Sequence, residues 1–117
     1  MGNRMRTPAQ LACVAERFKA LGEPARLQIL QALRAGERNV SELVVQTGLS
    51  QANLSKHLQL LHREGFVARR KAGLFTCYRL ADKDVFRLCD LMCGRVERQA
   101  AAQHRLLATD GEARRAS

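Results

Sequence analysis

Residues 41–62 constrain the fold of this chain more than any other stretch. Their sequence, SELVVQTGLSQANLSKHLQLLH, predicts two short helices separated by a sharp turn. Ser41 and Ser50 are suited to cap these helices, and Gly48 can adopt the positive φ that ends the first one. The second helix carries one apolar stripe at i, i+4 and i+7, formed by Leu54, Leu58 and Leu61. This pattern is typical of a helix-turn-helix, although a plain helical hairpin with a solvated polar face has the same spacing.

The segment that follows favours the helix-turn-helix. Residues 66–71 (FVARRK) predict an extended arm, Gly73 a hairpin tip, and residues 74–80 (LFTCYRL) a returning strand. Residues 50–80 contain six Lys or Arg side chains and a single acidic one, Glu64, which gives a local excess of five positive charges. A basic hairpin directly after a helix-turn-helix is the wing of a winged-helix DNA-binding domain.

Helices are predicted on both sides of this region. Thr7-Pro8-Ala9-Gln10 is typical of a helix start, and residues 8–20, 24–35 and 82–108 show helical patterns. Residues 85–96 (VFRLCDLMCGRV) are apolar on more than one side, so we expect this helix to pack partly on its own domain and partly on a second copy. The predicted fold is mainly α with a small β-hairpin: about five helices and a two-stranded wing in a domain of residues 8–108, dimerising through the first and last helices. Residues 1–7 are expected to be a flexible N-terminus and residues 109–117 a disordered tail.

The composition narrows the class of partner. Twenty Lys and Arg against eleven Asp and Glu give a formal net charge of +9 in 117 residues, which suggests nucleic acid or an anionic membrane surface. No apolar run approaches the roughly 20 residues of a membrane span, so we expect a soluble cytoplasmic protein without a membrane partner. No constellation of catalytic side chains or Gly-rich phosphate loop is present, so we do not expect an enzyme.

The motifs as a set resemble the ArsR/SmtB family of dimeric winged-helix repressors. The resemblance rests on residues 18–27 (FKALGEPARL), 49–58 (LSQANLSKHL), 61–67 (LHREGFV) and 78–80 (YRL). It implies a homodimer whose two recognition helices enter successive major grooves of an imperfect palindrome in double-stranded DNA. It also implies that an inducer releases the protein from its operator.

The expected DNA contacts lie on the second helix of the helix-turn-helix and on the wing. Gln51 and Asn53 carry amides suited to bidentate contact with adenine, and His57 is equally suited to DNA contact and to support of the fold. The wing residues would bind phosphates or the minor groove. The full predicted set is Ser50, Gln51, Ala52, Asn53, Ser55, Lys56, His57, Arg69, Arg70 and Lys71.

The sensing site is less defined, because two metal sites known in the family are absent. Residues 42–46 hold no Cys-x-Cys pair, and residues 90–92 (DLM) lack the histidine of the zinc site. Cys89 and Cys93 remain, at i and i+4 on the last helix, a spacing that suits two thiolate ligands for a soft ion. Cys13 from the first helix could add a third thiolate across the dimer, which would suit As(III), Sb(III) or a soft divalent ion. The same cysteines could instead respond to oxidants or reactive sulfur, or only pack in the interface.

Overall fold

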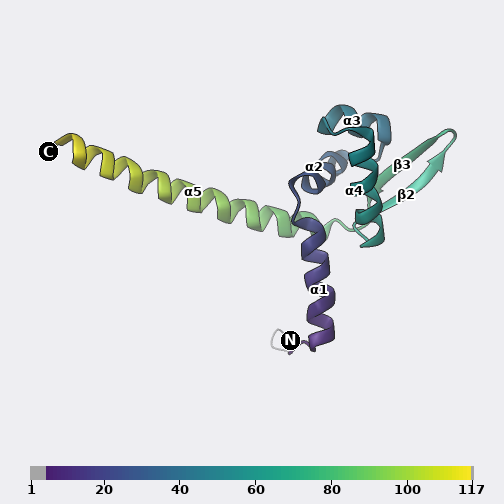
Figure 1. Ribbon diagram of the computed structural model, residues 1–117, viewed down its shortest axis with the longest axis horizontal. Coiled ribbons are helices and arrows are strands. Elements are labelled where there is room, and N and C mark those ends of the chain that lie inside the picture. The colour runs from purple at the N-terminus through teal and green to yellow at the C-terminus, as the bar shows by residue number, and fades with distance from the viewer. Residues whose placement is uncertain (1–4, 117) are drawn as a thin grey trace. The chain divides into compact units, whose positions relative to one another are not determined.

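The computed structural model describes the backbone of residues 5–116 and the side chains of residues 5–106. It divides into two units, one ending at Asp82 and the other beginning at Lys83. The first unit holds α1 (Pro8–Leu21), α2 (Pro24–Ala32), the 3-10 turn η1 (Leu33–Ala35), β1 (Arg38–Asn39), α3 (Val40–Thr47), α4 (Gln51–Arg63), β2 (Val67–Ala72) and β3 (Phe75–Leu80), and the second holds α5 (Asp84–Ala116) (Figure 1). Five α-helices and a hairpin wing confirm the predicted fold class. In the described part of the chain, no helix is long and apolar enough to span a bilayer.

The helix-turn-helix forms from strong local signals. The Ser50 hydroxyl accepts a hydrogen bond from the Asn53 amide at 3.2 Å and caps α4, as predicted. Gly48 has a φ of 73° and ends α3 in the left-handed conformation, also as predicted. The cap of α3 is different, because α3 begins at Val40, before Ser41. Asn39 accepts from the Glu42 amide at 2.8 Å, and the Glu42 carboxylate accepts from the Asn39 amide at 3.0 Å, so a capping box starts the helix earlier.

The core of the first unit is aliphatic and lies between α2, α3 and α4. Leu54, Leu58 and Leu61 are fully buried, which confirms the predicted stripe on α4. The other fully buried side chains are Ile29, Leu30, Leu33 and Leu43. Burying a side chain of this size contributes about 1.5–3 kcal/mol, so this stripe holds α4 firmly against α2 and α3.

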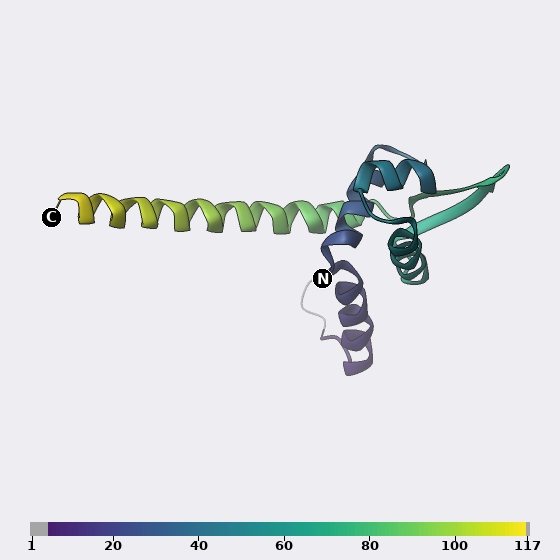
Figure 2. The ribbon, with the colours of Figure 1, turned by 45° about the horizontal axis from the view of Figure 1, so that its top comes forward.

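The wing belongs to a three-stranded antiparallel sheet with the order β1-β3-β2. The short strand β1 pairs Arg38 with Tyr78 and Asn39 with Cys77, and β2 pairs Arg70 with that same Cys77. The β2–β3 hairpin extends beyond α2, α3 and α4 in both views (Figure 1, Figure 2). The sheet therefore ties the root of the wing to the residue that caps α3.

The second unit is a single helix. It begins at Asp84, two residues later than expected, and it continues through residues 109–116, where a disordered tail was expected. Residues 112–116 (EARRA) are strong helix formers and follow Gly111, the one residue of that stretch that strongly disfavours a helix. The structure differs from the sequence expectation there, and residue 117 lies outside the described residues.

Candidate nucleic-acid interface

The N-terminal half of α4 presents the polar side chains that the sequence singled out. Gln51, Asn53 and Lys56 are exposed, and so are Ser50 and Ala52 at the start of the helix. Ser55 is only partly exposed. Because the leucines of the same helix are fully buried, the helix cannot rotate these amides and the lysine away from solvent. The N-terminus of a helix also carries unpaired amides and a partial positive charge, which favour a nearby phosphate.

His57 is held by a side chain from α2. Arg26 Nη1 lies 3.4 Å from His57 Nδ1, and since a guanidinium only donates, the imidazole nitrogen is the acceptor. The same Arg26 donates from Nε to the Ala20 carbonyl at 2.5 Å and from Nη2 to the Lys19 carbonyl at 3.2 Å. One arginine therefore joins the end of α1 to the recognition helix, and this geometry favours the supporting role for His57.

The three basic wing residues do not share one face of the sheet. Side chains alternate along a strand, so Arg69 and Lys71 lie on the face of the buried Val67, and Arg70 lies on the other face. Arg70 donates from Nε to Glu37 Oε2 at 2.9 Å and from Nη2 to Glu37 Oε1 at 2.6 Å. The hydrogen bonds and charge of Arg70, with a smaller contribution from the charge of Arg79, lower the pKa of Glu37 below its usual value. The hydrogen bonds to Glu37 and its charge raise the pKa of Arg70. Arg69 and Lys71 are exposed.

Sequence reasoning did not single out Glu37. It precedes the two-residue strand β1, in a segment (37–40) that the sequence predicts to be a short connection or a stub of strand. An acidic residue opposite a basic arm becomes noticeable once β1 is known to pair with β3.

The cysteines divide between the two units. Cys13 lies exposed on α1, and Cys77 is partly buried on β3. Cys89 and Cys93 lie one turn apart on α5, the first partly buried and the second exposed. Within the described residues of one chain, no group of three or more His, Cys, Asp or Glu side chains is arranged to hold a metal ion.

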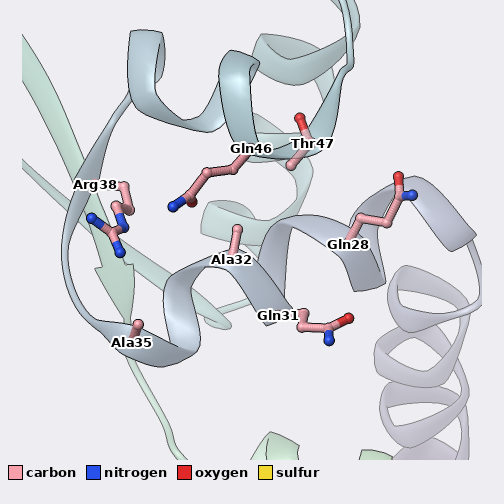
Figure 3. Close-up of a pocket in the computed structure, with 7 residues that line it drawn as sticks. All are labelled: Gln28, Gln31, Ala32, Ala35, Arg38, Gln46 and Thr47. Atoms are coloured by element: carbon pink, nitrogen blue, oxygen red, sulfur yellow. The ribbon is translucent and has the colours of Figure 1, made fainter.

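A shallow cavity of about 410 Å³ lies between α2, β1 and α3. In Figure 3, Arg38 and Gln46 point toward one another across it, whereas Gln28 and Gln31 point elsewhere. Arg38 Nη1 lies 3.6 Å from Glu42 Oε2, although its buried Nε has no hydrogen-bond partner among the described residues. Because only Arg38 and Gln46 turn toward one another here, and Arg38 also lies near Glu42, this cavity is a weaker candidate site than the exposed surface of α4.

Comparison with known proteins identifies the class of this chain. Residues 23–69 match the family described as bacterial regulatory protein, arsR family. The chain is 43% identical over 75 residues to the HTH-type regulator Rv0081 of Mycobacterium tuberculosis, covering 63% of this chain and 66% of that protein. The crystal structure of Rv0081 superposes with a TM-score of 0.73 at 34% identity and covers 84% of this chain and 98% of the solved one.

Two further relatives are a solved homodimeric domain and a named repressor. The winged helix-turn-helix domain of Mb0332 from Mycobacterium bovis, solved as a homodimer, has a TM-score of 0.72 at 37% identity, covering 86% of this chain and 94% of that one. A probable mercury resistance operon repressor of Streptomyces lividans is 40% identical over 68 residues, covering 58% of this chain and 54% of that protein.

The chain covers only part of the length of these curated relatives. The chain spans 40% of the length of the regulator Rv0324 of M. tuberculosis, at 41% identity over 91 residues, and 66% of Rv0081. The relatives named here are transcriptional regulators, and none is named as an enzyme. The chain folds as a winged helix-turn-helix, and its match covers almost all of the solved Rv0081 chain. This chain therefore belongs to the ArsR family of bacterial regulatory proteins.

Proposed function

We propose that this protein is a homodimeric transcriptional repressor that binds an imperfect palindromic operator and leaves it when an inducer binds. The observation that carries the proposal is the division of α4 into two sides. The leucine stripe is fully buried, while Gln51, Asn53 and Lys56 are exposed at the end of the helix that would enter a major groove. The wing adds exposed Arg69 and Lys71 for the phosphate backbone.

Dimerisation through α1 and α5 would cover their exposed apolar side chains. On α1 these are Leu11, Val14 and Phe18, which are 54, 43 and 57% exposed. On α5 these are Leu88, Leu91, Met92 and Val96, which are 48–72% exposed. Rows of this kind along helices are typical of surfaces that pack against a second copy, and the Mb0332 domain is a homodimer. Two-fold symmetry would place the two recognition helices about one turn of DNA apart.

The proposed inducer is a thiophilic metal or metalloid ion bound by Cys89 and Cys93. Side chains four residues apart on a helix lie on one face, about 5–6 Å apart, within reach of one soft ion. The described part of a single chain supplies no third ligand, so a three-thiolate site would need Cys13 of the second subunit. The name of the mercury resistance repressor among the relatives supports a soft ion as the class of inducer.

The DNA-binding proposal is tested by fluorescence anisotropy with a duplex from the region upstream of the protein's own gene. A protein that neutralises several phosphates loses affinity with salt, with a log–log slope of about −0.9 per contact. Lys56→Ala should weaken binding and, because a bound dimer carries two copies of Lys56, flatten this slope by about two contacts, or roughly 1.8. Gln51→Ala or Asn53→Ala should relax the preference at one position of each half-site. An equal loss on all sequences would refute a base-reading role.

The sensor proposal is tested on the reduced protein bound to the same duplex. As(III), Sb(III) or Cd(II) should release the DNA from the wild type. The Cys89→Ser/Cys93→Ser double variant should bind DNA normally but fail to respond, and Cys77→Ser, the matched control on β3, should respond as the wild type does. Release only by polysulfide or peroxide would make the pair a redox switch. No release by any of these reagents would leave the cysteines a packing role.

A further inference from the structure

The pair of Glu37 and Arg70 connects two parts of the DNA-binding unit that are distant in sequence. Glu37 lies just before β1, Arg70 lies in β2, and β3 runs between them. Asn39 and Arg70 both pair with Cys77 of β3, so Arg70 and the end of β1 are aligned across the sheet. Glu37 is two residues from Asn39 and therefore lies on the same face of the sheet, where it meets the guanidinium of Arg70 in a two-bond contact.

We propose that Glu37 and Arg70 are a positioning pair that fixes the direction of the wing relative to the helix-turn-helix, and that Arg70 is not a phosphate contact. The inference rests on the proposed DNA-binding function. Asn39 at the end of β1 is the N-cap of α3, so a tether between Glu37 and β2 is also a tether between the wing and the first helix of the helix-turn-helix. β1 contributes only two register pairs to the sheet, so the side-chain contact adds substantially to this connection.

The geometry of the contact depends on a guanidinium. Two parallel N–H groups of Arg70 meet the two oxygens of one carboxylate, which defines the orientation of both side chains. A lysine at the same place would keep the positive charge but would lose the fork. Orientation and charge can therefore be separated by replacing Arg70 with lysine.

The direction in which replacement of Glu37 changes DNA affinity distinguishes a positioning role from a purely electrostatic one. Removing a negative charge from a DNA-binding surface normally strengthens binding to the polyanion. If Arg70 instead exchanged Glu37 for a phosphate on binding, loss of Glu37 would also strengthen binding. A positioning role predicts the opposite, because a wing without its tether must be ordered when DNA binds.

The test compares Glu37→Gln, Arg70→Lys and the control Glu23→Gln on the upstream duplex over a range of salt concentrations. Glu23 is an exposed acidic residue at the start of α2 that makes no side-chain capping bond, so its variant has the same change in charge without loss of a contact. Glu37→Gln and Arg70→Lys should each weaken binding roughly two- to fivefold, with the wild-type salt slope. Glu23→Gln should bind as tightly as the wild type or slightly more tightly.

Hydrogen exchange of the DNA-free variants supplies an independent readout. The amides of β2 and β3 should exchange faster in Glu37→Gln and Arg70→Lys than in the wild type, while those of α4 stay protected. Tighter binding by Glu37→Gln, or unchanged binding and exchange in Arg70→Lys, would overturn the positioning role. Absence of wild-type binding to the duplex would refute the proposed function and with it this role in DNA recognition. Faster β2 exchange in the variants would then show only that the tether itself exists.

Discussion

Replacement of Arg26 by methionine should destabilise the protein by about 2 kcal/mol. Methionine keeps most of the apolar stem of the side chain but removes all three donors, those to the Ala20 and Lys19 carbonyls and to His57. Hydrogen bonds from charged donors contribute about 1.5–3 kcal/mol each when well formed. Only the bond to Ala20 is short, at 2.5 Å, while the other two are 3.2 and 3.4 Å and the side chain is partly exposed. We therefore assign most of the lost stability to the hydrogen bond with the Ala20 carbonyl, since Ala20 is buried.

The assay is urea unfolding followed by circular dichroism, at a fixed protein concentration because dimerisation contributes to the apparent stability. With a slope of about 2 kcal/mol/M for a chain of this size, the midpoint should fall by roughly 1 M without a change in slope. Arg63→Met is the control, since that side chain is 73% exposed and its nearest acidic partner, Glu64, is 3.7 Å away. It should shift stability by less than about 0.5 kcal/mol. A loss for Arg26→Met no larger than that of the control would refute the reasoning.

Three further predictions concern the core, the turn and the acid response. Leu58→Ala should destabilise by about 2–5 kcal/mol in the same assay, because Leu58 is fully buried, and a loss under 1 kcal/mol would mean that the core collapses around the gap. Gly48→Ala should cost about 1 kcal/mol through the left-handed backbone alone, since no described atom lies within 4 Å of an added Cβ, and unchanged stability would contradict the φ of 73°. Glu37 has a pKa below its usual 4.5, so its ion pair with Arg70 stabilises the fold above that pH and is lost as the pH falls through the lowered pKa. The midpoint of the wild type should then fall more steeply with acid than that of Glu37→Gln, and identical acid dependence would count against the pair.

The sequence was sufficient to predict features that depend on neighbours along the chain. The stripe of leucines on α4, the left-handed Gly48 and the Ser50 cap each follow from spacing or residue type, and all three were confirmed. The cap of α3 shows the limit of such signals. Ser41 and Asn39 are both good capping residues, and the reciprocal bond from Glu42 decides for Asn39.

Features that depend on pairing across the sheet could not be predicted. The wing arm Arg69-Arg70-Lys71 looks like one basic cluster in the sequence, but strand alternation and the pairing of β1 divide it. The proposed role of Cys89 and Cys93 likewise depends on a neighbouring subunit. Their spacing on one helix predicts that they can act as a pair of thiolate ligands, but not which further ligand would complete a metal site.

The strand order has a consequence for the behaviour of the protein at high concentration. Because β3 lies in the middle of the sheet, β2 is an edge strand, with backbone N–H and C=O groups on one side available to a strand from another molecule. Arg69 and Lys71 on this strand repel a second copy of the same edge, whereas the charge of Arg70 is paired with Glu37. The charges that serve DNA binding therefore also oppose aggregation of the wing through β-pairing. Variants that replace Arg69 and Lys71 with neutral β-formers should lose solubility as well as affinity.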